Sequence, residues 1–343
     1  MLSINKTSAE TKMFKDQCRW QALRSLAMIA VAAALTGTSA SAQDLPTKPI
    51  RIVSPFATGT GPDIVARLLG EKLSKSLQQP VVVDAKPGGN GFIAAEEVKR
   101  APADGTVMLL VDNGHVTINP ALFSKLPYDV ERDFAPVGLL FRTPFFVAVS
   151  TSGPYRSVAD LIGAAKAKPG EVSYGTPFVG SPSHLGSALL ESLTGTQMIH
   201  VPFKETPQLW TAISTGEVSW GLGTIASTRP MVQSGRLKLM AIAASQRLPT
   251  HSTIPTVAEL GGPSGYEVNA WVALLAPRAT PTRALQRLNA EINNALQEKD
   301  LLERFVSFGF EPTPSTVSQL ADLIRADTRK FGELVKRTGA KAD

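Results

Sequence analysis

Short apolar runs alternate with segments of helical spacing along most of the chain after residue 50. Ile50–Val53 has the pattern of a buried strand, and apolar residues between Ile64 and Leu77 recur at the spacing of an amphipathic helix. Val81–Val83 and Val107–Val111 are further strand-like runs, with a helix expected between them. This alternation predicts an α/β fold of parallel βαβ units, with helices on both faces of the sheet.

The alternation starts again after residue 150 with different loops, and from residue 281 the pattern is almost entirely helical. The expected helices are Val158–Ala167, Ser183–Leu193, Gln208–Ser214, Ala226–Gln233, Arg283–Gln297, Asp300–Phe308 and Ser315–Thr338. The expected strands are Val172–Tyr174, Met198–Val201, Val218–Leu222 and Leu237–Ala243.

Two strand-like stretches, Pro144–Val149 and Val268–Leu275, join the halves, so the chain is expected to cross between them twice. This predicts one domain from residues 43–144 plus 267–343 and a second from residues 145–266, with a ligand cleft between the lobes. Ligands of open parallel sheets bind outside the carboxyl ends of the strands, which directs attention to the loops that follow strands.

Residues 1–42 have the order of a secretory signal peptide. Basic residues precede the apolar run Leu26–Leu35, and Ala40-Ser41-Ala42 supplies the small-residue cleavage site, so cleavage is expected between Ala42 and Gln43. The apolar run is about half of the ~20 residues that a membrane span needs. We therefore expect an exported, soluble, periplasmic protein, whose single cysteine, Cys18, leaves with the signal.

Charge gives little indication of a macromolecular partner. Half of the net charge of +6 belongs to the signal, and the remaining basic residues are scattered among few aromatic residues. This pattern does not predict binding to nucleic acid.

The loop from Pro55 to Asp63 (PFATGTGPD) lies between a predicted strand and a predicted helix. Its glycines allow close approach to a ligand, and the free N–H groups of a helix start favour an anion. Thr58 and Thr60 add hydroxyl donors, while Asp63 can cap the helix or fix the loop instead of meeting the ligand. The spacing matches neither a dinucleotide fingerprint nor a phosphate-binding P-loop, and a plain turn remains the alternative.

A second loop, Thr176–Leu185, also joins a predicted strand to a helix start. Ser181 and Ser183 suit helix caps and can equally donate to a carboxylate. Together the loops predict two anion-binding ends that face each other across the cleft.

Catalysis and metal binding find little support in the residues. The four histidines form no zinc-binding spacing, and neither a nucleophile elbow nor a mature cysteine is present. Ser181 with His184 suggests a hydrolase only weakly, because a capping serine beside a structural histidine explains the same spacing. We expect no enzyme activity, no cofactor and no metal.

Several motifs appear in the order typical of one protein family. They are the loop Pro55–Asp63, Pro87–Gly91, Asn119–Phe123, Leu126–Asp129, His200–Lys204, Ile254–Glu259 and Leu274–Pro277. The chain thereby resembles the Bug family, the binding proteins of tripartite tricarboxylate transporters, over nearly everything after Lys48.

The resemblance implies a type II-like, two-domain periplasmic binding fold that closes on a small carboxylate, either a di- or tricarboxylate or an aromatic one. It implies contacts from both loops, with the first loop holding a carboxylate through backbone groups. The implied ligand-binding residues are Phe56, Ala57, Thr58, Gly59, Thr60, Asp63, Thr176, Gly180, Ser181 and His184. Phe178 and Gly223, which depart from the family pattern, are expected at the same site. The implied partners are a large and a small integral-membrane subunit, with the receptor itself a monomer. A sensor that presents the closed form to a receptor ectodomain is the alternative.

Three positions depart from the family pattern. Phe178 stands where glycine is common, and Ser219 and Gly223 stand where aspartates are common. Losing two acidic groups near the cleft disfavours an amino-acid ligand, and Phe178, with Trp210 or Trp220, favours a flatter or more apolar carboxylate. The alternative is that Phe178 points into the core.

Overall fold

The computed structural model describes residues 45–339. The predicted signal, its cleavage site between Ala42 and Gln43, and Cys18 lie outside the described residues. Within the described range, each helix is either too short or too polar to cross a lipid bilayer.

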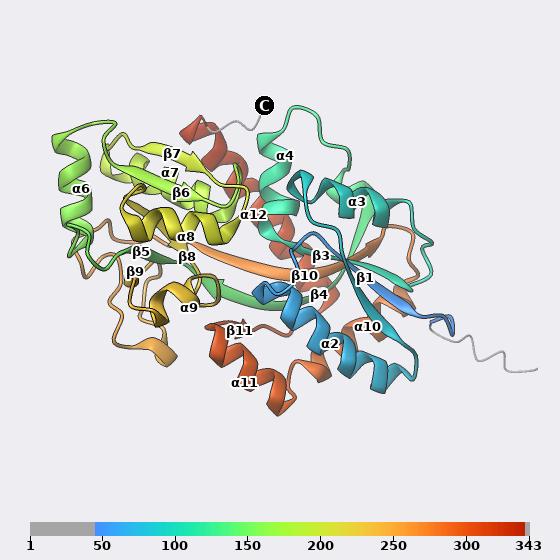
Figure 1. The fold of residues 1–343 in the computed structure, drawn as a ribbon. Coiled ribbons are helices and arrows are strands. Elements are labelled where there is room, and N and C mark those ends of the chain that lie inside the picture. Colours follow the sequence, from blue (N-terminus) through green and yellow to red (C-terminus); the bar gives the residue numbers. More distant parts are fainter. Residues whose placement is uncertain (1–44, 340–343) are drawn as a thin grey trace, which may run out of the picture. The chain divides into compact units, whose positions relative to one another are not determined.

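Two β-sheets with helices packed against them make up the described chain (Figure 1). The first sheet has the strand order β11-β4-β10-β3-β1-β2. Its strands are β1 (Ile50–Ser54), β2 (Val81–Ala85), β3 (Val107–Asp112), β4 (Phe134–Pro144), β10 (Asn269–Pro277) and β11 (Glu311–Pro312). The second sheet has the order β7-β6-β8-β5-β9. Its strands are β5 (Phe146–Ser150), β6 (Ser173–Thr176), β7 (Ile199–Pro202), β8 (Trp220–Gly223) and β9 (Leu237–Ile242).

The helices also form two groups, each packed against one of the two sheets. Those that belong with the first sheet are α2 (Gly61–Leu77), α3 (Phe92–Lys99), α4 (Asn119–Leu122), α5 (Val130–Asp133), α10 (Thr282–Ala295), α11 (Lys299–Phe308) and α12 (Val317–Thr338). Those that belong with the second are α6 (Val158–Ala167), α7 (Pro182–Thr194), α8 (Thr206–Thr215) and α9 (Ile225–Gln233). Short helical turns occur at Gly89–Gly91, Gly114–Ile118 and Pro249–His251.

The two crossings between the sheets are bonded to each other. Phe145 alone separates β4 from β5, and its N–H donates to the carbonyl of Val268, just before β10, at 3.0 Å. The N–H of Val268 donates to the carbonyl of Ala243 at 2.9 Å. The N–H of Ala243 in turn donates to the carbonyl of Phe145 at 2.8 Å. The predicted α/β fold with two strand-like crossings is confirmed, while the exact domain limits at residues 144 and 266 stay a prediction.

The expectation of parallel βαβ units is wrong for part of each sheet. β1 pairs in parallel with β2 and β3, but β10 is antiparallel to both β3 and β4. In the second sheet β5 is antiparallel to β8 and β9. The parallel rule applies to strands joined by a helical crossover within one sheet, whereas β4 runs on into β5 of the second sheet and β10 returns from the second half to the first sheet.

Each sheet has apolar helices packed on both faces. Leu69 and Leu73 of α2 and Leu288 of α10 lie in the cluster on one face of the first sheet, and Leu320 of α12 lies in the cluster on the other. The C-terminal helices therefore complete the core begun by β1–β3. Trp220 and Leu209 lie in the two corresponding clusters around the second sheet.

Candidate functional site

Both predicted loops lie where the first sheet and its helices meet the second. A Cβ placed on Gly61, at the start of α2, would lie 3.4 Å from the Cβ of Ala226 in α9. A Cβ placed on Gly180 would lie 2.4 Å from Cδ1 of Leu122 in α4. The structure thus places each of the loops after β1 and β6 against an element of the other half, and their sharing one site stays a prediction.

The first loop is held in shape by a buried carboxylate. Asp63 is 1% exposed, and its Oδ2 accepts from the backbone N–H of Gly59 at 2.9 Å and from Nε of Arg67 at 3.0 Å. Its Oδ1 accepts from Nη2 of Arg67 at 3.0 Å. The hydrogen bond that Arg67 donates to Asp63 is also the main cause of the raised pKa of Arg67. Of the two roles considered for Asp63, this geometry favours fixing the loop.

The N–H groups that this loop leaves open include those of Ala57 and Thr58. Thr60 directs its own N–H and its hydroxyl to the carbonyl of Ala57, at 3.2 and 2.8 Å. Phe56 donates to Oγ of Ser54 at 3.2 Å. Among the described residues the amides of Ala57 and Thr58 have no hydrogen-bond partner, and both residues are exposed. Two adjacent free amides in the turn that leads into a helix can bind an anion together with the helix N-terminus.

A buried acid–imidazole pair supports the same loop from behind. The ring of Phe56 packs edge-on against His115, with centroids 5.5 Å apart. Nδ1 of His115 lies 2.6 Å from Oδ1 of Asp112. Burial opposes ionisation of Asp112, but the contact with His115 outweighs it, so the pKa of Asp112 is lowered.

The second loop is shaped by hydroxyl groups. Oγ of Ser181 caps α7 by accepting from the N–H of His184 at 3.2 Å, and it lies 3.0 Å from Oγ of Ser183. The hydroxyl of Thr176 bonds the carbonyl of Phe178 at 3.2 Å and Nε2 of His200 at 2.7 Å. These bonds fix the loop and leave Phe178 partly exposed and outside the apolar core clusters of the described residues.

Two stacked histidines lie directly under this loop. The rings of His184 and His200 are 4.1 Å apart and nearly parallel, and Tyr174 stacks on the far side of His200 at 5.2 Å. Burial lowers the pKa of both histidines to about 4, and at His184 the proximity of His200 adds to the effect. Both rings are therefore neutral at pH 7, so the loop offers neutral donors to an anion.

The hydrolase alternative is not supported by this geometry. His184 contacts Ser181 through its backbone N–H, while its ring Nδ1 accepts from the N–H of Gly180 at 3.1 Å. A general base needs a ring nitrogen within reach of the serine hydroxyl, and this ring nitrogen is already engaged. No group of three or more potential metal ligands occurs among residues 45–339.

Two of the three residues that depart from the family pattern, Ser219 and Gly223, lie at opposite ends of β8. Ser219 lies at the amino ends of β6 and β8, where its Oγ accepts from the N–H of Ser173 at 3.1 Å. The sequence-based placement of Ser219 near the cleft is therefore wrong, because the loops of the site follow the opposite ends of these strands. Gly223 lies at the carboxyl end of β8, as expected for a residue of the site.

Sequence reasoning missed Arg67 and gave His200 no role in the site. The spacing of Asp63 and Arg67, four residues apart at a helix start, is the signal for their ion pair. The pairing of His200 with Thr176 and His184 depends on two neighbouring strands and a helix, so no local pattern predicts it.

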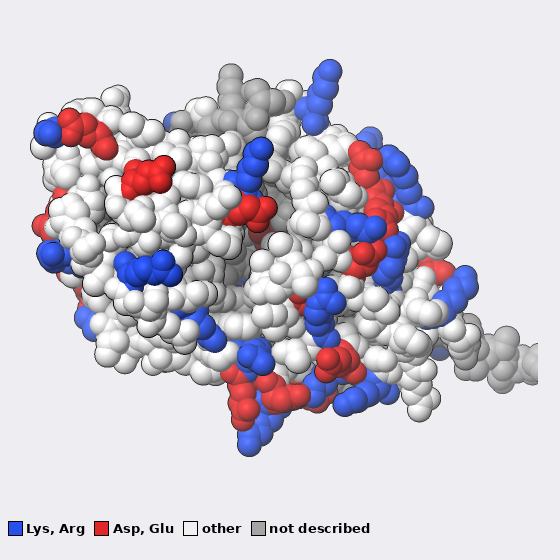
Figure 2. All heavy atoms as spheres, viewed as in Figure 1, with Lys and Arg blue, Asp and Glu red and all other residues white. Residues whose placement is uncertain are grey.

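The charged side chains on the viewed face gather mainly along its right-hand and lower edges (Figure 2). The centre of this face is hollowed, and a patch with charged side chains of both signs lies beside the upper part of the hollow (Figure 2).

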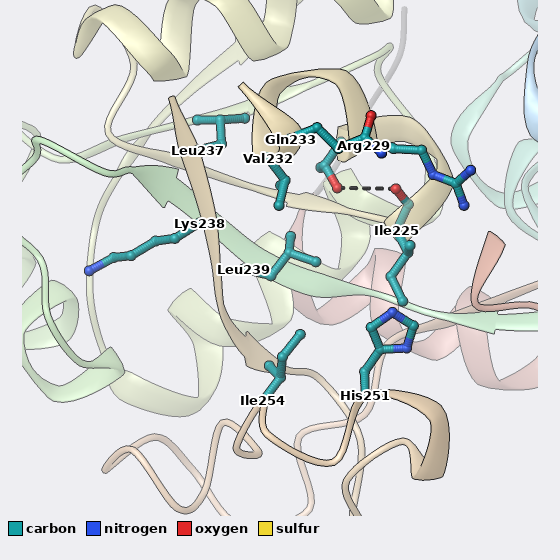
Figure 3. A pocket seen from close by; sticks show the side chains of 10 residues that line it. Ile225, Arg229, Val232, Gln233, Leu237, Lys238, Leu239, His251 and Ile254 are labelled. Atoms are coloured by element: carbon teal, nitrogen blue, oxygen red, sulfur yellow. Dashed lines mark hydrogen bonds between the residues drawn. The ribbon is translucent and has the colours of Figure 1, made fainter. Parts of the chain in front are cut away.

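A separate cavity of about 320 Å³ lies between α9, β9 and the turn at Pro249–His251. Ile225, Leu239 and Ile254 contribute apolar side chains to it, whereas the charged ends of Arg229 and Lys238 point away (Figure 3). Because its lining offers few polar groups, this cavity does not suit a carboxylate.

Comparison with known proteins identifies the family of the chain. Residues 65–340 match the model of the tripartite tricarboxylate transporter family receptor. The chain belongs to this family. The protein BugT of Bordetella pertussis is a relative of this receptor, with 32% identity over 321 residues, covering 93% of this chain and 98% of BugT. The resemblance to the Bug family is confirmed.

Solved structures of similar receptors have the same fold. Rpa4515 of R. palustris with adipate has a TM-score of 0.81 at 31% identity, covering 86% of this chain and 99% of that one. MatC of Rhodopseudomonas palustris with bound malate has a TM-score of 0.77 at 30% identity, covering 85% of this chain and all of that one. The predicted periplasmic binding protein fold is thereby confirmed for this family member.

Proposed function

We propose that this receptor captures a small carboxylate in the periplasm and delivers it to the large and small membrane subunits of a tripartite transporter, without catalysis. The observation that carries the proposal is the pair of free amides at Ala57 and Thr58, in the turn before α2 that Asp63 fixes through Gly59. In this proposal they face a second loop that is rich in hydroxyl groups. The adipate and malate in two similar receptors support the same ligand class.

In this proposal the first loop binds one carboxylate through Ala57, Thr58 and the backbone near Gly59. Phe56, Thr60 and Asp63 shape that loop. From the other half, Gly180, Ser181 and His184 complete the site, with Thr176, Phe178 and Gly223 around them. The ligand stabilises the closed form because only that form lets both loops contact it at once.

A thermal-shift comparison tests the ligand class on the monomeric chain that starts at Gln43. Adipate or malate at about 100 times its Kd should raise the free energy of unfolding by about 2.7 kcal/mol, which is several degrees in melting temperature. Adipamide is the matched control, because it keeps the shape of adipate and removes both charges. An equal shift with adipamide, or no shift with any di-, tri- or aromatic carboxylate, contradicts the proposal.

Small-angle scattering tests closure separately. The crossing strands provide the bend, so a saturating carboxylate should reduce the radius of gyration. A radius that stays unchanged at saturation excludes domain closure, even if a carboxylate binds.

A further inference from the structure

The cavity between α9, β9 and the turn at Pro249–His251 is larger than the gaps that packing usually leaves in a protein. Its volume is about 320 Å³. Protein interiors contain few voids larger than a water molecule, whereas sites for small molecules begin at about 300 Å³. The cavity lies beside β9, the last strand of its sheet, and among the described residues a bridge between Ile242 and Thr256 is all that pairs with the outer edge of β9.

Apolar side chains from different elements surround this cavity (Figure 3). Val232 of α9, Leu239 of β9 and Ile254 after the turn are each only partly buried, so part of their apolar surface stays uncovered. The cationic ends of Arg229 and Lys238 point away from the space (Figure 3). An apolar occupant is therefore stabilised by covering this surface, whereas an ionised one loses its hydration without gaining a partner.

The lining also offers a neutral hydrogen-bonding group, the imidazole of His251. Its ring points toward Ile225 (Figure 3), its Nδ1 lies 3.1 Å from Oγ1 of Thr250, and its Nε2 has no hydrogen-bond partner among the described residues. Burial lowers the pKa of His251, and the charge of Arg229 adds to the effect, so the ring is neutral at pH 7. The hydroxyl of Thr228, in contrast, is engaged with a carbonyl one turn earlier in α9, at 2.9 Å.

The wall that Ile225 contributes is shared with the other half of the molecule. Ile225 is the first residue of α9 and is 8% exposed. A Cβ placed on Gly309, directly after α11, would lie 2.4 Å from Cδ1 of Ile225. Ile225 thus has the cavity on one side and the end of α11 on another, so the space in the cavity depends on how α9 packs against α11.

We propose that this cavity is a second binding site of the receptor, which takes a small, uncharged and mostly apolar molecule with one hydrogen-bonding group. The apolar walls provide the affinity, and Nε2 of His251 orients the occupant. None of the lining residues belongs to the two loops described above, so binding here does not depend on the proposed function.

Fluorescence titration with N-phenyl-α-naphthylamine tests this site on the chain that starts at Gln43. This probe is uncharged, has a single N–H and emits strongly in apolar surroundings. Anilinonaphthalene sulfonate keeps the same ring system but adds a charge, and should bind at least about tenfold more weakly. Equal binding of the two probes, or no saturable binding of the uncharged one, overturns the proposal. Displacement of the uncharged probe by excess adipate would place it between the loops and also overturn it.

A charge placed in the wall locates the bound probe. Ile254→Asp should weaken binding of N-phenyl-α-naphthylamine at least about tenfold. Ile199→Asp is the matched control, because Ile199 is 49% exposed on β7, at the opposite edge of the same sheet. Val232→Asp brings the charge from α9 and replaces Ile254→Asp if melting curves show that the latter fails to fold. Affinities equal to that of Ile199→Asp would mean that the probe binds elsewhere, and the site would be refuted.

Gly309→Ala tests the shared wall without changing a lining residue. The added methyl group should displace Ile225 toward the cavity, so that the uncharged probe binds about three- to tenfold more weakly. Gly195→Ala is the control. Both glycines follow a helix with similar positive φ, 65° and 62°, but nothing lies within 4 Å of a Cβ at position 195. Equal affinities of these two variants would remove Ile225 from the wall of the site.

Discussion

At the scale of single residues, side chains of both loops bond mainly to their own backbone. The carboxylate of Asp63 accepts a hydrogen bond from the N–H of Gly59, and Oγ of Ser181 accepts one from the N–H of His184. Such bonds create the loop conformation that aims the remaining free donors outward. We therefore expect substitutions here to affect binding through loop shape more than through lost ligand contacts.

Asp63→Ala should weaken adipate binding at least tenfold, because the N–H of Gly59 and the guanidinium of Arg67 lose their buried acceptor. The free energy of unfolding should fall by about 1–3 kcal/mol. Asp160→Ala is the control, since Asp160 also accepts backbone N–H groups at a helix start but lies on α6, outside both loops. Calorimetry and urea denaturation measure the two effects, and unchanged affinity in Asp63→Ala would remove this loop from the site.

Gly180→Ala should impair binding where Gly170→Ala does not. Both glycines have positive φ, 88° and 78°, so each substitution costs about 1 kcal/mol of stability. Only the Cβ at position 180 meets another group, Cδ1 of the buried Leu122 across the junction, at 2.4 Å. Titration calorimetry with adipate should show weaker binding for Gly180→Ala alone, and equal affinities would contradict the contact between halves.

Single residues also show where sequence reasoning succeeds and fails. The first loop is predictable because its glycines, hydroxyl groups and helix start are contiguous. Ser219 is misplaced because its match to a family position does not tell which end of β8 it takes. The close approach of Trp210 to Gly223 depends on packing between α8 and β8, which no local pattern records.

At the scale of elements, contacts between the two halves lie on both sides of the crossing strands. On one side, Leu185 of α7 packs in a cluster with Leu122 of α4 and Leu334 of α12. On the other, Arg229 of α9 lies over the ring of Phe308 of α11 at 5.2 Å. The sequence predicts α7, α9, α11 and α12 well but does not predict the short α4. It also misses most of strand β4, because both faces of this strand are buried and its residues do not alternate.

Arg229→Ala should reduce the affinity for adipate by about two- to fivefold, because a cation–π contact at the surface contributes about 0.5–1 kcal/mol to the closed form. Arg304→Ala provides a matched control. Its guanidinium also lies over Phe308, at 5.6 Å, but on the same helix, so it does not join the halves. If the two variants bind adipate equally well in calorimetry, the contact does not contribute to closure.

At the scale of the whole molecule, stability should depend on pH through the stacked histidines. His184 and His200 have pKa values near 4 in the folded chain, against an ordinary value of 6.5. The unfolded chain therefore binds more protons between these values. Stability is complete above about pH 6.5 and declines as the pH falls toward 4, by up to about 1.4 kcal/mol per pH unit for each histidine.

Urea denaturation between pH 7 and pH 4.5 measures this slope. His200→Gln should roughly halve the slope of stability against pH, because only one of the two histidines then titrates. The pKa of His184 should also be lowered less, because His200 no longer contributes to its shift. A variant with the slope of the unmodified protein would show that other groups cause the dependence.

The neutral character of both loops has a consequence for the conditions under which the receptor works. Screening by dissolved ions weakens attraction between separated charges, but it hardly affects short bonds from amides and hydroxyl groups to a bound oxygen. Asp63 and Arg67 cancel each other's charge, and His184 and His200 are uncharged at pH 7. In the proposed site, long-range charge attraction therefore contributes little to the binding of an anion. Under the proposed function, the receptor should therefore bind its carboxylate about equally well at low and at high salt, and electrostatic steering should not accelerate the capture of that ligand.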